Sequence, residues 1–541
     1  MHFADLFEAV ADAVGDGPAL VNGSQTRSWA ELDDRASRLA TALQSAGLTA
    51  NSKIGFFLYN GNEYTEAYFA TLKMRGVAVN INYRYRGKEL QYLLDYSDAE
   101  ALFYHRSLSS VVAEVANSLP KLKLLVEVDD GGDGYIDALS YEGLIASSAP
   151  AARIERSDED QFMNFTGGTT GYPKGVVYRM GDVTSFYLAS LPSFFGSTAV
   201  LNSSEDVAAF AKDLSASPAP PVSLPACPLM HTAGLMNGLL TQMLCGAKIV
   251  TLQSRSFDAS EMLVAIERER VTFSVIVGDA FCRPILDALN IAAKNDRYYD
   301  LSSLKFIMSS GVAWSLESKQ QLLKSVDAYL IDAMGATEGG MGMSICSRDI
   351  PPTPTGKFGK MPDTKVFTED DREIEPGSGE AGYIAAGGKF VPIAYYKDPE
   401  KSAKTFRTIN GKRYSFTGDM GTIDADGTLN LLGRGSGCIN TAGEKVFPEE
   451  VEGVLNRHPL IVDSLVLGAP HERFGQCVAA VVALSDLQIA DDDMTKSLQE
   501  YCKVEMAGYK CPRIIKFVSA IVRGANGKPD YKWAARQLNE G

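Results

Sequence analysis

Hydrophobic and polar positions alternate between two spacings along the first 150 residues, and this alternation predicts strands and helices in turn. Continuous apolar runs at 54–58 and 77–81 have the length and composition of buried strands. Residues 62–75 and 88–96 have the spacing of amphipathic helices, and Gly76 ends the first of them. A repeated strand–helix order favours an α/β domain with doubly wound, largely parallel sheets.

Local signals predict where two elements near the N-terminus end or begin. Residues 20–22 form a strand pattern that runs into a hairpin turn at Gly23. Ser28 and Glu31 have the spacing of a capping box, so a helix is expected to begin beside them.

The last hundred or so residues predict a small α+β domain. Pro448, with acids directly after it, has the signature of a helix start. Residues 464–467 and 478–484 have strand patterns, and 493–505 has a helical one.

Three glycines within 433–437 are poor material for a helix or strand and good material for a hinge. We therefore predict a large N-terminal domain at 1–434 and a mobile C-terminal domain at 435–541. The hinge is expected at Ser436.

Length and charge narrow the function classes. A chain of 541 residues is too long for one compact domain. Its net charge of −15 argues against a general nucleic-acid binder, because phosphate contacts need a basic surface. A local basic site for an anionic nucleotide stays compatible with this charge.

The cysteines and the N-terminus predict a cytoplasmic protein. The eight cysteines are scattered without a Cys-x-x-Cys pair or a His/Cys cluster, which favours reduced thiols over zinc or disulfides. Residues 1–16 lack the basic start of a signal peptide, and no apolar run approaches the roughly 20 residues of a membrane span.

The stretch 165–176 carries the first candidate chemistry. Glycines let a backbone approach a ligand closely, and successive N–H groups there form a nest for an anion. By composition alone, a solvated surface turn fits about equally well. The stretch is not a Walker A loop, because Pro173 precedes Lys174 and Gly175 follows it. The candidate phosphate-binding residues are Thr166, Gly167, Gly168, Thr169, Thr170, Gly171 and Lys174.

This stretch resembles the phosphate loop of the adenylate-forming superfamily, which includes acyl-CoA synthetases, luciferases and the adenylation domains of peptide synthetases. Gly167 stands where serine is usual, which removes one hydroxyl donor and leaves the backbone N–H. The resemblance implies ATP as a substrate and Mg²⁺ as a cofactor.

Further segments resemble the same superfamily in the same order along the chain. Residues 309–313 are similar to the strand end along the adenine, which implies that Gly311, Val312 and Ala313 contact the base. Residues 332–339 resemble the Tyr-Gly-x-Thr-Glu segment. This implies that Thr337 binds the α-phosphate and that Glu338 holds Mg²⁺. Met334 replaces the usual aromatic residue beside Gly335, so the adenine would rest on a thioether.

The ribose side and the catalytic lysine are implied in the same way. Asp419 would accept both ribose hydroxyls, and Arg434 would bind ribose or phosphate. Lys528, in a segment similar to Pro-Arg-x-x-x-Gly-Lys with Val522 in place of proline, is the expected catalytic lysine. The segment 440–445 matches the loop lining the CoA channel, with Ala442, Gly443, Glu444 and Lys445 as channel residues.

Two further segments concern the acyl side. His231 lies in a segment similar to Pro-x-x-His-x-x-Gly, which implies a place between the acyl and phosphate sites. Asp258 lies in a stretch similar to the amino-acid-binding Phe-Asp-x-Ser of peptide synthetases, but its position favours a helix start. The predicted acyl pocket comprises Leu235, Met236, Gly278, Ala280, Phe281, Gly339 and Gly340, because small side chains leave volume and large ones offer apolar surface.

The resemblance implies an AMP-forming acyl-CoA ligase. Residues 80–85, 277–284 and 524–531 look closest to actinobacterial ligases for steroid side chains and fatty acids, so a bulky hydrophobic acid is the predicted substrate.

Two other functions stay open. One is an adenylating enzyme that delivers its acyl group to a carrier protein or to oxygen. The other is a non-catalytic nucleotide-binding regulator, against which Lys528 and Glu338 argue because a pure binder needs neither. The oligomeric state is open as well, with a homodimer as one option.

Overall fold

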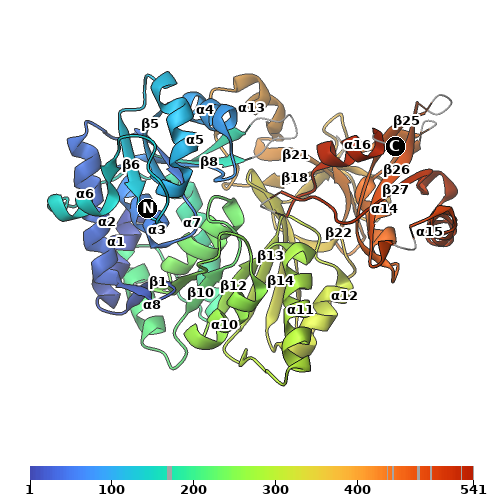
Figure 1. Ribbon diagram of the computed structural model, residues 1–541, viewed down its shortest axis with the longest axis horizontal. Coiled ribbons are helices and arrows are strands. Elements are labelled where there is room, and N and C mark those ends of the chain that lie inside the picture. The colour runs from blue at the N-terminus through green and yellow to red at the C-terminus, as the bar shows by residue number, and fades with distance from the viewer. Residues whose placement is uncertain are drawn as a thin grey trace.

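The structure is a computed structural model that describes residues 1–166, 173–434, 437–441, 444–471, 475–487, 490–524 and 527–539. Figure 1 shows a large body and a smaller C-terminal body, coloured orange to red. This mixed α/β architecture confirms the predicted fold class. The boundary at residue 434 stays a prediction, and the expected hinge, Ser436, lies outside the described residues.

A parallel sheet carries the first part of the chain. Its order is β4-β3-β5-β6-β7, and every pairing in it is parallel. The strands are β3 (Lys53–Phe57), β4 (Val77–Asn80), β5 (Ala99–His105), β6 (Leu124–Val128) and β7 (Leu139–Ser140). The helices between and around them are α2 (Trp29–Ser45), α3 (Asn62–Lys73), α4 (Gly87–Tyr96), α5 (Ser109–Val115) and α6 (Tyr141–Ser147).

The predicted strand–helix alternation is therefore confirmed, as is the capping box of Ser28 and Glu31 at the start of α2. The helix α3 ends two residues before the predicted end, because Arg75 takes a left-handed φ of 63° ahead of Gly76.

A 14-stranded sheet forms the centre of the large body. Its order is β17-β18-β21-β22-β16-β15-β14-β13-β12-β10-β11-β1-β2, with β20 paired to β21. The run from β14 to β1 is parallel, and the pairings from β14 to β17 are antiparallel. The strands are β1 (Pro18–Asn22), β2 (Gln25–Ser28), β10 (Val222–Pro225), β11 (Lys248–Thr251), β12 (Phe273–Ile276), β13 (Phe306–Ser310), β14 (Tyr329–Ala336), β15 (Gly339–Cys346), β16 (Lys357–Lys360), β17 (Lys365–Phe367), β18 (Gly382–Gly387), β20 (Phe406–Ile409), β21 (Lys412–Ile423) and β22 (Thr428–Arg434).

Helices cover the large body and enclose its apolar core. One core cluster gathers around Trp29, Phe7 and Phe69, and another around Trp314 and Phe281. The helices are α1 (Phe3–Val14), α7 (Met180–Ser190), α8 (Ser204–Ser215), the π-helical segment η4 (Ala233–Leu240), α9 (Thr241–Met243), α10 (Ala259–Glu269), α11 (Gly278–Lys294), α12 (Leu316–Ser325) and α13 (Pro399–Thr405).

A three-stranded antiparallel sheet holds the predicted phosphate loop. Its order is β19-β9-β8, with β8 (Gln161–Thr166), β9 (Lys174–Arg179) and β19 (Ala394–Tyr395).

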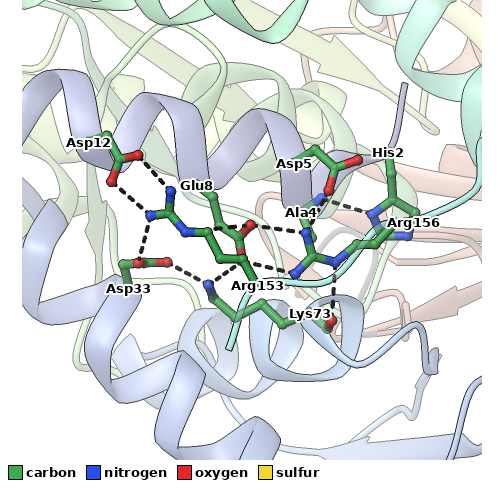
Figure 2. A network of polar contacts seen from close by, with 9 residues as sticks. All are labelled: His2, Ala4, Asp5, Glu8, Asp12, Asp33, Lys73, Arg153 and Arg156. Carbon is green, nitrogen blue, oxygen red and sulfur yellow. Dashed lines mark hydrogen bonds and ion pairs between the residues drawn. The ribbon is translucent and has the colours of Figure 1, made fainter. Parts of the chain in front are cut away.

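A buried ionic network fixes the chain just before β8 (Figure 2). The Arg156 side chain is 2% exposed, and its guanidinium lies 2.9 Å from Glu8 Oε1. Lys73, 3% exposed, pairs with Glu8 and Asp33 at 2.6 Å each. Because buried charges are tolerated only when paired, the network ties α1, α2 and α3 to the chain entering β8.

The small body contains a separate sheet, β24-β23-β26-β25, with β27 parallel to β26. Its helix α14 begins at Pro448 as predicted. The strands are β23 (Ile439–Thr441), β24 (Glu444–Val446), β25 (Ile461–His471), β26 (Gly475–Leu484) and β27 (Ile514–Val518), and the helices are α14 (Pro448–Leu455), α15 (Asp492–Glu505) and α16 (Tyr531–Asn539).

Candidate active site

The β8–β9 hairpin brings the two ends of the predicted phosphate loop together. Thr166 and Lys174 are register partners across the hairpin. The loop residues between them, Gly167, Gly168, Thr169, Thr170 and Gly171, lie outside the described residues.

The buried amide of Asn80 fixes one end of this hairpin. Its Nδ2 donates to the carbonyl oxygens of Phe165 at 2.9 Å and of Met230 at 2.5 Å. Its Oδ1 accepts from the N–H of Phe165 at 2.6 Å. One side chain thus satisfies three backbone groups and joins the loop strand to the segment that carries His231.

Glu338 lies at the other end of the loop, buried to 6% exposure. The Tyr395 hydroxyl donates to Glu338 Oε1 at 2.7 Å, and Lys174 Nζ lies 3.8 Å from the same oxygen. Lys174 Nζ also lies 4.3 Å from the centroid of the Tyr395 ring. Burial and the Glu338 carboxylate raise the pKa of Tyr395, so its hydroxyl stays protonated and keeps donating.

Threonine hydroxyls join the next part of the site. Thr337 Oγ1 lies 3.0 Å from Thr232 Oγ1, and Asn164 Nδ2 donates to Thr232 Oγ1 at 2.9 Å. The Tyr178 hydroxyl donates to the Thr337 carbonyl oxygen. The turn 337–338 is therefore held by β8, by β9 and by the residue after His231.

Glycines shape this turn at the end of the β14–β15 hairpin. A Cβ at Gly335 would lie 2.9 Å from the Gly339 carbonyl oxygen, and a bulge separates Met334 from Gly335. Met334 is 8% exposed and packs in a core cluster with Met341 and Phe358. Its contact with adenine stays a prediction.

The predicted adenine strand end contacts the start of α11. The N–H of Gly278 donates to Ser309 Oγ at 2.8 Å. Gly278 has a φ of 47°, and a Cβ there would lie 2.4 Å from the Ala313 carbonyl oxygen and 2.6 Å from that of Val312. Glycine is required here because backbone occupies the space that a side chain would fill.

The small residues of the predicted acyl pocket therefore differ in what surrounds them. A Cβ at Gly339 would lie 2.8 Å from the Ala386 Cβ, whereas Gly340 faces open space among the described residues. A side chain would therefore meet open space at Gly340 and neighbouring atoms at Gly278 and Gly339, and the place of these glycines in an acyl pocket stays a prediction.

The large residues of the predicted acyl pocket are mostly buried in the hydrophobic core. Leu235 and Met236 are 1% and 2% exposed and belong to a core cluster. Phe281, whose ring centroid lies 4.1 Å from that of Phe257, lines a cavity of about 50 Å³ that also involves Tyr83 and Arg84.

His231 precedes the π-helical segment η4. Its Nε2 is buried and has no hydrogen-bond partner among the described residues. Burial, helped by the charges of Lys528 and Arg84, lowers the pKa of His231 to about 4, so the ring is neutral at neutral pH. The Lys528 charge thus acts on this ring from the small body.

The turn carrying Lys528 rests on the large body. Gly527 has a φ of 70°, and a Cβ there would lie 3.0 Å from the Ala280 Cβ and 3.1 Å from Val277 Cγ1. Within the turn, the N–H of Gly524 donates to the Lys528 carbonyl oxygen at 2.8 Å. Ala280 thus faces the lysine turn.

The ribose and CoA residues are only partly described. Asp419 and Arg434 are register partners across β21 and β22, and the Thr417 hydroxyl donates to Asp419 Oδ2. Arg434 is described by its backbone alone. Of the CoA-channel residues, Glu444 and Lys445 lie in β24 with their side chains outside the description, and Ala442 and Gly443 lie wholly outside it.

Comparison with known proteins identifies the family. Residues 7–396 match the AMP-binding enzyme family, and residues 450–528 match the AMP-binding enzyme C-terminal domain. The chain belongs to the AMP-binding enzyme family. The predicted class, an AMP-forming acid–thiol ligase, is confirmed.

Relatives within the family cover nearly all of the chain. A 3-oxocholest-4-en-26-oate–CoA ligase of Rhodococcus rhodochrous is 39% identical, covering 99% of this chain and 96% of the relative. A medium/long-chain-fatty-acid–CoA/3-oxocholest-4-en-26-oate–CoA ligase of Mycolicibacterium smegmatis is 37% identical with the same coverage. The crystal structure of the anthranilate CoA ligase AuaEII with anthranoyl-AMP shares the fold, with a TM-score of 0.84, 22% identity and coverage of 100% and 98%.

None of the eight cysteines, all of which lie in the described ranges, forms a disulfide, and seven of them are buried. Within the described ranges, no helix is both long and apolar enough to span a membrane. Asp258 caps α10 through the N–H groups of Ser260 and Glu261, which confirms its interpretation as a helix start.

Sequence reasoning missed the residues that support the motif residues. Asn80, Asn164, Tyr178 and Tyr395 hold members of the family motifs through hydrogen bonds between distant segments. Strand position alone offered a weak signal, since a polar residue at the end of a buried strand, such as Asn80, needs partners.

Proposed function

We propose that the protein joins a bulky hydrophobic carboxylic acid, a steroid side-chain acid or a medium- to long-chain fatty acid, to CoA. The names of the two relatives described above support this acid class. Apolar rings at Phe257 and Phe281 and the open space at Gly340 also favour a large substrate over acetate.

In the first half-reaction, a carboxylate oxygen of the acid attacks the α-phosphorus of ATP. The bond between that phosphorus and the bridging oxygen breaks, and pyrophosphate leaves with the electron pair. Lys528 and Lys174 offset the negative charge on the phosphates, and the Thr337 hydroxyl binds an α-phosphate oxygen. Because the His231 ring is neutral, it does not repel the ammonium group of Lys528. The residues act by positioning and charge stabilisation.

Glu338 would hold Mg²⁺, whose charge neutralises phosphate oxygens when it is bound. The residues fit this role, because a carboxylate offers two oxygens and Tyr395 and Lys174 orient it through Oε1. Since the described residues contain no group of three potential ligands, phosphate oxygens and water would complete the coordination.

In the second half-reaction, the CoA sulfur attacks the acyl carbon of the adenylate. The bond to the AMP oxygen breaks, AMP leaves, and the thiol proton passes to water. We place the CoA channel along 442–445 of a domain spanning 435–541, which turns about Ser436 relative to a domain spanning 1–434.

The observation that carries this proposal is the contact of the Lys528 turn with Val277 and Ala280, beside the strand end expected to bind adenine. The test measures pyrophosphate release, and CoA-dependent AMP release, with a 3-oxosteroid C26 acid, palmitate, octanoate and acetate. We expect kcat/KM for the larger acids to exceed that for acetate. A higher kcat/KM for acetate than for octanoate would overturn the acid class.

The same assay separates the other functions. AMP release that needs a carrier protein and ignores CoA would indicate delivery to a carrier. No pyrophosphate release with any acid, despite ATP binding, would indicate a regulator.

The open glycine gives a second test of the pocket. Gly340→Leu places a side chain where a Cβ meets open space, so we expect kcat/KM for palmitate to fall about tenfold relative to octanoate. Gly278→Ala is the contrasting variant: its Cβ would collide with backbone, so we expect lost stability and no change in chain-length preference. Unchanged preference in Gly340→Leu would show that the acid lies elsewhere.

A further inference from the structure

Arg283 on α11 makes a contact that the reaction scheme above does not use. Its Nη1 donates to the carbonyl oxygen of Val462, a residue of β25 in the small body. The Arg283 side chain is 36% exposed and also lies 3.3 Å from Asp279 Oδ2, one turn earlier on α11. The contact therefore joins the large body to the small one.

An irregularity in β25 makes this carbonyl available. The β25–β26 register pairs Ile461 with Leu484 and Asp463 with Ala483, so Val462 is skipped by the ladder. Such a bulge leaves one residue unpaired and turns its backbone groups away from the neighbouring strand. A free carbonyl on the sheet edge can then accept from a cation on another domain.

The small-body side of the contact leads directly to the catalytic lysine. Asp463, next to Val462, pairs with both Nε and Nη2 of Arg523 at 2.8 and 2.7 Å. Arg523 Nη1 donates to the Gly527 carbonyl oxygen at 3.3 Å, and Gly527 precedes Lys528. The position of Val462 therefore fixes the position of the lysine turn.

The large-body side leads to the predicted adenine strand. Asp279, the partner of Arg283, donates its N–H to the Ala313 carbonyl oxygen at 3.1 Å and accepts from the N–H of Ser315 at 3.1 Å. Through Asp279, Arg283 is connected to the segment 313–315, which follows the strand end expected to bind adenine.

We propose that Arg283 is a positioning residue for the adenylation half-reaction: its bond to Val462 holds the small domain in the orientation that presents Lys528. The bond breaks when the small domain turns for thioester formation. The inference rests on the proposed function, and it assigns Arg283 to one half-reaction only.

The test is a pair of single-turnover assays at saturating substrates. In Arg283→Met, which keeps an apolar stem and loses the donors, we expect pyrophosphate release to slow about tenfold. Thioester formation from supplied acyl-adenylate and CoA should stay within about twofold. Arg283→Lys, which keeps a donor, should restore part of the first rate. Lys294→Ala, which removes a cation from the other end of α11, is the matched control and should change neither.

A second measurement does not depend on turnover. Spin labels at Val200→Cys and Val504→Cys, which are 70% and 84% exposed on the large and small bodies, report the distance between them with ATP bound in a Cys438→Ser background. Arg283→Met should broaden or shift the distance distribution between the two labels, and Lys294→Ala should not. Equal losses in both half-reactions, or an unchanged distance distribution, would overturn the inference. Absence of pyrophosphate release in the unmodified protein would instead overturn the proposed function.

Discussion

The two sides of the site are held in different ways. On the large-body side, Asn80, Tyr395 and the Thr232–Thr337 contact join distant segments through short, mostly buried hydrogen bonds. On the small-body side, the lysine turn is tied to its own domain by Arg523 and meets the large body through the packing of Gly527 and the bond from Arg283. The first arrangement is preorganised, whereas we propose that the second is released between the two half-reactions.

This difference matches the demands of two successive reactions. Phosphate groups must stay bound while the α-phosphorus is attacked, so fixed donors are favourable there. In the proposed rotation Lys528 leaves before the CoA channel forms, so contacts that break easily across the domain interface are favourable.

The largest expected effect is that of Lys528→Ala. Removing the ammonium group should slow adenylate formation about 10²- to 10³-fold, since it removes a charge that stabilises the transition state. Thioester formation from supplied acyl-adenylate should be nearly unchanged, because the lysine serves only the first orientation. Separate single-turnover assays measure both rates. Equal losses in the two halves would mean that the lysine is not released between them.

Ser436→Pro should give the opposite pattern. Proline fixes φ near −65° and restricts Gly435, so the hinge would lose the freedom to turn. We expect pyrophosphate release to persist and thioester formation to fall about 10²-fold, because the CoA channel would be misplaced. Normal rates in both assays would show that the hinge lies elsewhere.

Asn80→Ala should affect both half-reactions together. The variant leaves the N–H and C=O of Phe165 and the C=O of Met230 without their partner, at a cost of about 2–3 kcal/mol in the free energy of unfolding. Urea unfolding gives the stability, and the two assays give the rates. Asn82→Ala, which removes only an exposed cap on the N–H of Arg84, is the matched control and should cost under about 1 kcal/mol. If Asn80→Ala slowed only one half-reaction, Asn80 would not be supporting the site in both of them.

The order of elements could be predicted from the sequence because it depends on local patterns, and the family motifs were found in the same way. The capping box at Ser28 and the helix start at Asp258 can both be read from neighbouring residues. The supports could not be read in this way: Asn80 contacts Phe165 and Met230, 85 and 150 positions away.

The small residues show a second limit of sequence reasoning. Gly278 and Gly340 look alike in the sequence, and both suggest space for an acyl group. In the structure, backbone atoms fill the space beside Gly278, whereas the space beside Gly340 is open. Which glycine leaves volume depends on chain segments that no local pattern reveals. The same holds for the bulge at Val462, which only the strand register shows.

The smallest expected effect concerns His231, whose ring lies where the two sides of the site meet. Its pKa of about 4 has burial as its first cause and the Lys528 charge as its second. In Lys528→Met we therefore expect the pKa to rise and yet stay below the ordinary value near 6.5. NMR titration of the five imidazoles, with His231→Asn to assign the signal, measures this.

The pKa of His231 also predicts how the free energy of unfolding changes with pH. Between pH 6.5 and about 4 the unfolded state binds a proton that native His231 does not, so the free energy of unfolding should fall as pH falls through this range. In Lys528→Met the native pKa is higher, so the acid-induced loss attributable to His231 should be smaller, and His231→Asn should abolish that part. If Lys528→Met leaves the pKa of His231 unchanged, the lysine is not near the ring in solution, and the small domain spends its time in another orientation.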